Sequence, residues 1–90
     1  MTLPHTTNDA IVMYTTSWCP DCHRAKALLR DYDIEFIEVD VEENPEGLAY
    51  VKQVNGGHRV VPTIVFPDGS ILVEPSNAVL TEKLGLALEW

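Results

Sequence analysis

Basic side chains are scarce in this chain, which holds six Lys and Arg against fourteen Asp and Glu and therefore has a formal net charge of −8. A surface with this excess of carboxylates repels phosphate backbones and anionic lipid headgroups. We therefore expect no nucleic-acid partner and no membrane partner. The first nine residues lack the basic and apolar segments of a signal peptide or membrane anchor, so the expected compartment is the cytoplasm.

Length and cysteine content narrow the choice further. Ninety residues with 46% apolar content are enough for one compact domain and too few for two. We expect a flexible lead at 1–9, a domain at 10–84 and a tail at 85–90, and we expect the chain to act as a monomer. Only two cysteines are present. In a reducing compartment, a close pair of cysteines is more often catalytic or metal-binding than structural.

The hydrophobic pattern predicts seven elements. Short apolar runs with β-branched residues predict strands, and helical spacing between turn and capping residues predicts helices. The strands are expected at 10–15, 34–41, 63–66 and 70–74, and the helices at 20–33, after an Asn44 cap, and after a Ser76 cap. A parallel βαβ unit joined to an antiparallel hairpin gives a four-stranded mixed sheet with helices on both faces. This βαβαββα order resembles the thioredoxin fold, an α/β class.

The same spacing predicts which side chains face the core. In the first helix, we expect an inner face and an outer face. The inner set is Ala25, Leu28, Leu29 and Tyr32, and the outer set is Arg24, Lys26, Arg30 and Asp31. In the last helix, Val79, Leu80 and Leu84 are expected to be buried.

Both cysteines lie in the stretch "TTSWCPDCHRAK", directly after the first strand. A thiol at the start of a helix meets unpaired backbone N–H groups and the positive end of the helix dipole, which stabilise a thiolate. Cys19 occupies that position and is the predicted nucleophile. Cys22 lies one turn further on the same side, within reach of a disulfide but less open to solvent, and is the predicted resolving thiol. A stabilised thiolate is also a good leaving group, which favours an enzyme that turns over thiol adducts.

Two neighbouring residues are candidate modulators of the Cys19 thiolate. An imidazolium at His23, four residues after Cys19, would stabilise the thiolate, whereas the carboxylate of Asp21 would repel it. A solvated histidine on an exposed helix face is the alternative for His23. The sequence does not rank the two opposing effects.

The same stretch matches two other patterns. Cys19-Pro20-Asp21-Cys22-His23 fits the C-x-x-C-H pattern of covalent haem attachment, but that reading requires an export signal. A zinc site requires four ligands, and only His5 and His58 remain as further nitrogen donors, without paired spacing. We therefore expect no metal ion in a single chain.

The segment Trp18-Cys19-Pro20-Asp21-Cys22, together with Val61-Pro62-Thr63 before the third strand, resembles the glutaredoxin family. Within that family, "YTTSWCPDC", "VNGGHRVVPT" and "DGS" are similar to the mycoredoxin branch, which works with mycothiol. The resemblance implies a thiol-disulfide oxidoreductase with a cis bond before Pro62, whose adjacent backbone at Val61 pairs with the substrate. It also implies substrate contacts from Trp18, Pro20 and Arg59.

The resemblance further implies a co-substrate and partners. No bound cofactor is expected, and the co-substrate is a low-molecular-weight thiol, either mycothiol or glutathione. Glutathione-dependent members commonly hold the two glutathione ends with a lysine and a Gly-Gly-acidic segment, whereas this chain reads Thr15-Thr16-Ser17 and Glu74-Pro75-Ser76-Asn77 there. Mycothiol, which lacks those carboxylates, is therefore favoured. Two alternatives remain, a dithiol donor fed by a flavoprotein disulfide reductase and a dimer that shares an iron-sulfur cluster.

Overall fold

The computed structural model describes residues 10–86, and its elements follow the predicted order. They are β1 (Ile11–Thr15), α1 (Pro20–Asp31), β2 (Phe36–Asp40), α2 (Pro45–Val54), β3 (Thr63–Val65), β4 (Ile71–Val73) and α3 (Asn77–Leu84). The sheet order is β2-β1-β3-β4, with β1 parallel to β2 and antiparallel to β3, and β3 antiparallel to β4. The predicted mixed sheet is confirmed, although all four strands are shorter than expected, β2 by the most.

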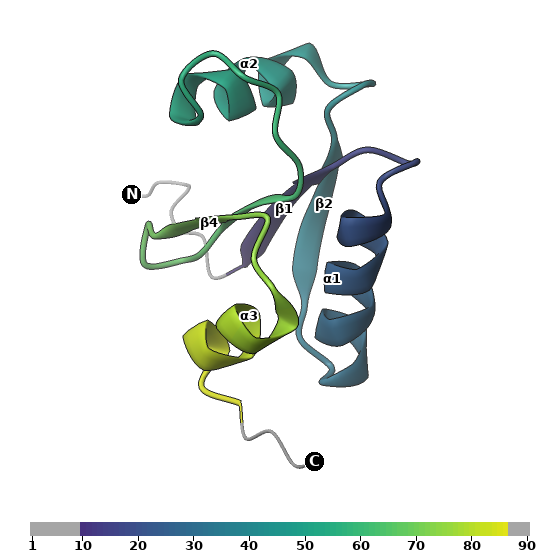
Figure 1. Cartoon of the computed structure of the whole chain (residues 1–90), viewed down its shortest axis with the longest axis vertical. Helices are drawn as coiled ribbons and strands as arrows, with labels where there is room; N and C mark the ends of the chain where they lie inside the picture. Colours follow the sequence, from purple (N-terminus) through teal and green to yellow (C-terminus); the bar gives the residue numbers. More distant parts are fainter. Residues whose placement is uncertain (1–9, 87–90) are drawn as a thin grey trace, which may run out of the picture.

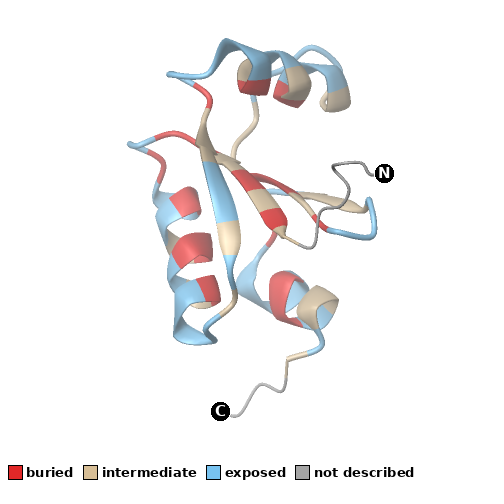
Figure 2. Cartoon of the chain, turned by 180° about the vertical axis from the view of Figure 1, so that it is seen from behind, coloured by how far each residue is buried: buried red, intermediate tan, exposed pale blue. Residues whose placement is uncertain are grey.

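Helices cover both faces of the sheet (Figure 1). α1 and α3 lie on the face that carries the main core, and the buried positions of α1 turn toward the sheet (Figure 2). The core consists of Ile11, Met13, Ala25, Leu29, Ile64, Phe66 and Leu80. α2 covers the opposite face, where Gly47 packs against Val39 and Tyr14. β1 is therefore covered on both sides.

Helix ends are set by local residues, as the sequence predicts. The side chain of Asn44 accepts the backbone N–H of Gly47 at 2.8 Å at the start of α2. Ser76 caps α3 in the same way, accepting the N–H of Val79 at 3.2 Å. Each side-chain oxygen satisfies one of the N–H groups that the first helical turn leaves without a partner. None of the helices among residues 10–86 is long and apolar enough to cross a membrane.

Three predictions about helix faces are wrong. Lys26, expected on the outer face of α1, is buried, because its ammonium donates to Glu38 Oε2 on β2 at 2.7 Å. Tyr32, expected inside, is exposed, because α1 ends at Asp31 and Tyr32 forms its C-cap. Val79 is exposed on α3, where only Leu80 and Thr81 are fully covered.

Candidate active site

Cys19 is the N-cap residue of α1, as predicted. Its backbone is extended, with φ −87° and ψ 113°, and the helix begins at Pro20. Cys19 Sγ accepts the backbone N–H of Cys22 at 3.1 Å. A sulfur that bears negative charge accepts such a bond more strongly than a neutral one. The first turn of α1 therefore supplies a backbone N–H donor to Cys19 Sγ.

Cys22 lies inside α1 and is fully buried. Burial, followed by the hydrogen bond with Cys19, raises the pKa of Cys22 to about 12. Both cysteines are thiols in this structure. Both residues are buried, but Cys19 keeps 5% exposure and lines the pocket, whereas Cys22 is fully covered and does not line it.

The loop before β3 lies directly beside Cys19. The Val61–Pro62 peptide bond is cis, as the resemblance implies. The Cys19 thiol lies 3.9 Å from the carbonyl oxygen of Val61 and donates to it. Pro62 itself is buried behind this contact. The backbone of Val61 is therefore next to the sulfur.

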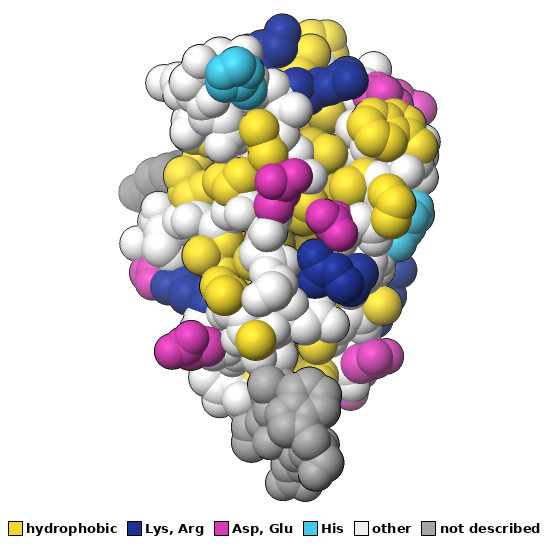
Figure 3. Space-filling view, viewed as in Figure 1, with side chains coloured by type: hydrophobic (Ala, Val, Ile, Leu, Met, Phe, Trp, Pro, Cys, Tyr) yellow, Lys and Arg dark blue, Asp and Glu magenta, His cyan; other side chains and the backbone are white. Residues whose placement is uncertain are grey.

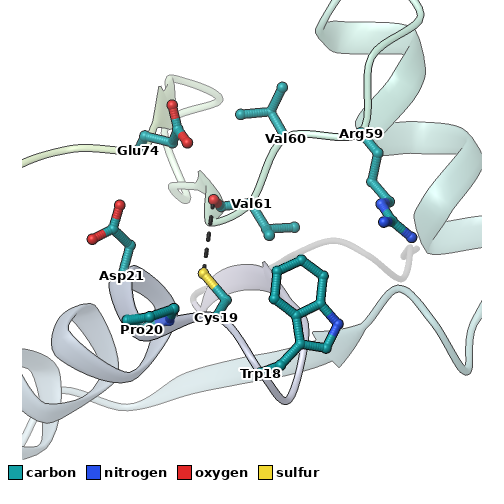
Figure 4. A pocket seen from close by; sticks show the side chains of 8 residues that line it. All are labelled: Trp18, Cys19, Pro20, Asp21, Arg59, Val60, Val61 and Glu74. Carbon is teal, nitrogen blue, oxygen red and sulfur yellow. Dashed lines mark hydrogen bonds between the residues drawn. The ribbon is translucent and has the colours of Figure 1, made fainter.

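A pocket of about 440 Å³ opens over the sulfur (Figure 4). Eight residues line it, namely Trp18, Cys19, Pro20, Asp21, Arg59, Val60, Val61 and Glu74. They come from the start of α1, the loop before β3 and the end of β4, three segments that are distant in the sequence. Figure 3 shows apolar side chains spread over this face of the molecule, with acidic side chains among them and basic side chains above and below.

At one wall of the pocket, the side chains of Trp18, Arg59 and Glu42 contact one another. Trp18, which is 58% exposed, donates its indole N–H to Glu42 Oε2 at 2.8 Å. The guanidinium of Arg59 lies 5.9 Å from the centre of the Trp18 ring and 4.0 Å from the same Glu42 oxygen. A cation over an indole face is attracted to it, and both groups share one carboxylate. Glu42 therefore holds Trp18 and Arg59 in place.

His23 does not line the pocket. It is exposed on α1, and its Nε2 lies 2.9 Å from the carbonyl oxygen of Ser17, to which it donates. This arrangement matches the alternative of a solvated histidine. Asp21 does line the pocket and also lies 3.6 Å from Arg24.

Comparison with known proteins identifies the family. The family model named Glutaredoxin matches residues 11–71. A Mycobacterium tuberculosis protein that carries the glutaredoxin name is 47% identical over 75 residues, which are 83% of this chain and 89% of that protein. The chain belongs to the glutaredoxin family. Mycoredoxin 1 of Corynebacterium glutamicum is 36% identical over 75 residues, covering 82% of this chain and 91% of the relative.

Solved structures agree with this assignment. The crystal structure of a glutaredoxin from Methanosarcina mazei superposes with a TM-score of 0.71 at 28% identity, over 86% of this chain and 79% of that one. A thioredoxin-like protein shares the fold, with a TM-score of 0.77 at 21% identity over 89% of this chain and all of that one. This glutaredoxin is therefore a thiol-disulfide oxidoreductase with a Cys-x-x-Cys pair. The family works with disulfide-containing proteins and a low-molecular-weight thiol.

The structure brings most of the predicted site residues together and adds others. Around Cys19 it gathers the predicted residues Trp18, Pro20, Asp21, Arg59 and Val61, with Pro62 behind them. Sequence reasoning missed the roles of Glu42, Val60 and Glu74 at this site. A signal for Glu42 existed, because it follows β2, and β2 is parallel to β1, so both strands end at the same edge of the sheet.

Proposed function

We propose that this glutaredoxin reduces mixed disulfides between proteins and a low-molecular-weight thiol, with a mycothiol-type thiol favoured over glutathione. The Cys19 thiolate attacks the small-thiol sulfur of the mixed disulfide. A disulfide forms between Cys19 and the small thiol, and the protein thiolate leaves and takes a proton. A second small-thiol anion then attacks the adduct and supplies the electron pair, so that a symmetrical small disulfide forms and Cys19 leaves as a thiolate.

Cys22 is the predicted resolving thiol, but its burial supports the proposal that a second small thiol releases the adduct more readily than Cys22 does. Burial, followed by the hydrogen bond with Cys19, raises the pKa of Cys22, so its thiolate is a minor species at pH 7. Only the thiolate attacks a disulfide, so intramolecular release of the adduct by Cys22 is disfavoured. Cys19, at the open end of the helix, can instead be reached by a second small thiol through the pocket.

Three observations support a thiol without terminal carboxylates. Arg59 is the one cation among the pocket-lining residues, and it is already close to Glu42. Two carboxylates, Asp21 and Glu74, line the same pocket. A relative at 36% identity is named Mycoredoxin 1. Glutathione has two carboxylates to place here, whereas mycothiol lacks the glutamyl and glycyl carboxylates.

The test uses a peptide whose cysteine is joined to mycothiol or to glutathione. Wild type, Cys22→Ser and Cys19→Ser are compared in turnover with the matching small thiol as reductant. We expect Cys22→Ser to keep much of the activity, Cys19→Ser to lose it, and the mycothiol adduct to be the better substrate. Equal loss in both variants would contradict the one-thiol route and favour a dithiol donor fed by a flavoprotein reductase.

A further inference from the structure

Glu74 has a backbone conformation that is unusual for its residue type. It follows β4 directly and has φ +51°, in the left-handed region that favours glycine. Among residues 10–86, Asp33 is the other non-glycine residue with positive φ. The N–H of Glu74 donates to the carbonyl oxygen of Pro62 at 2.9 Å, which ties it to the loop beside Cys19. A side chain kept in such a conformation beside a reactive group indicates a functional use.

The charges around the pocket are separated into two sides (Figure 4). Asp21 and Glu74 lie on one side of Cys19, whereas Trp18 and Arg59 lie on the other. The ion pairs found among residues 10–86 involve Asp21, Glu38, Glu42 and Asp68, and none of them includes Glu74. The exposed carboxylate of Glu74 therefore lines the pocket that contains Cys19 without a cation beside it in any of these ion pairs.

We propose that Glu74 is a specificity-determining residue that selects against small thiols bearing a carboxylate near the reacting sulfur. This inference rests on the function proposed above, in which a small thiol is carried on Cys19. A carboxylate on that adduct is repelled by Glu74 and has no proton to donate to it. A hydroxyl or ammonium group can instead donate to Glu74, so hydroxyl-bearing thiols and aminothiols are the preferred class.

The test uses three small thiols that differ mainly in charge, each as a mixed disulfide with the same peptide. They are 3-mercaptopropionate, 2-mercaptoethanol and cysteamine. In Glu74→Gln, which keeps the size of the side chain, the ratio of kcat/KM for the carboxylate adduct to that for the alcohol adduct rises about fivefold, as removal of one close exposed charge predicts. The ratio for the ammonium adduct to the alcohol adduct falls.

Two further measurements separate the local charge of Glu74 from other effects of the substitution. In about 1 M salt, where the screening length shrinks to about 3 Å, the ratios of wild type approach those of Glu74→Gln. Glu82→Gln changes the net charge by the same amount at an exposed position outside the pocket, and it leaves both ratios unchanged. An equal shift in Glu82→Gln would overturn the inference, because it would show an effect of total charge.

The backbone is tested separately. Glu74→Gly and Asp33→Gly both place glycine at a positive φ, so both raise the urea midpoint of unfolding. Only Glu74→Gly also raises the carboxylate-to-alcohol ratio. If wild type turns over the alcohol adduct while Glu74→Gln leaves the ratios unchanged, the role of Glu74 is refuted and the proposed function stands. If neither these three adducts nor the mycothiol adduct is turned over, the proposed function itself fails.

Discussion

The ion pair between Lys26 and Glu38 should respond very differently to loss of its two partners. Lys26 Nζ donates to Glu38 Oε2 at 2.7 Å, and the Thr15 hydroxyl donates to the same oxygen at 2.8 Å. The side chain of Lys26 is 9% exposed and that of Glu38 is 35% exposed. Removing the carboxylate thus leaves an ammonium with little access to water, whereas removing the ammonium leaves a carboxylate that water can still reach.

The structure sets the size of this asymmetry. Removing one partner costs about 3–5 kcal/mol in a fully buried pair, and an exposed pair contributes less than about 1 kcal/mol. Glu38→Gln in this half-buried pair should therefore lower the free energy of unfolding by about 2 kcal/mol. Lys26→Met keeps most of the apolar contact of the lysine chain and should cost less than about 1 kcal/mol. The double variant should recover most of the loss in Glu38→Gln.

The pH dependence of stability gives a second measurement of the ion pair between Lys26 and Glu38. The hydrogen bond from Lys26, assisted by that from Thr15, holds the pKa of Glu38 below its ordinary value of 4.5 despite some desolvation. Because the folded state is then the weaker proton binder, this stabilisation is present above pH 4.5 and is lost as the pH falls through the folded-state pKa. The stability difference between wild type and Lys26→Met should shrink over that interval.

The assay is urea unfolding of wild type, both single variants and the double variant at pH 7 and across the acid range. The more exposed pair of Lys83 and Asp68, at 2.8 Å, provides the control, and Asp68→Asn should lose less stability than Glu38→Gln. Our reasoning would be refuted if Lys26→Met were more damaging than Glu38→Gln, or if Glu38→Gln matched wild type at pH 7.

Three further predictions concern packing, reactivity and the pocket wall. Gly47→Ala should lower the free energy of unfolding by about 1 kcal/mol despite better helix propensity. The reason is that a Cβ added at this glycine would lie 2.8 Å from Val39 Cγ1. In a double-mutant cycle, Val39→Ala should therefore offset part of the loss. Iodoacetamide at pH 8 should add one group per reduced chain by intact mass, on Cys19, because burial raises the pKa of Cys22; labelling of both sulfurs would contradict this. Glu42→Ala should speed solvent exchange of the pocket tryptophan's indole proton in NMR spectra, since its acceptor at 2.8 Å is removed, and unchanged exchange would argue against this contact.

Features that depend on near neighbours in the chain were predictable. The caps at Asn44 and Ser76 and the place of Cys19 at the start of α1 all follow from residues within a few positions. The order of elements follows from hydrophobic spacing. The cis bond before Pro62 was different, because only the resemblance to a family implied it.

Contacts between distant segments were not predictable in the same way. Lys26 reads as a surface residue of a helix until β2 places Glu38 beside it. Trp18 and Glu42 are 24 positions apart, and the parallel order of β1 and β2 places both at one edge of the sheet without showing that the two side chains meet. Glu74 reaches the pocket only because the hairpin of β3 and β4 returns the chain to the loop before β3.

The sequence by itself determined the elements, their order and the cysteine pair, because these depend on local periodicity and on backbone groups within one helical turn. The tertiary structure decided which charges meet around Cys19. It placed Glu42 behind Trp18 and Arg59, and it placed Glu74 on the pocket rim opposite them. Chain packing brings these groups together over separations that leave no periodic pattern in the sequence.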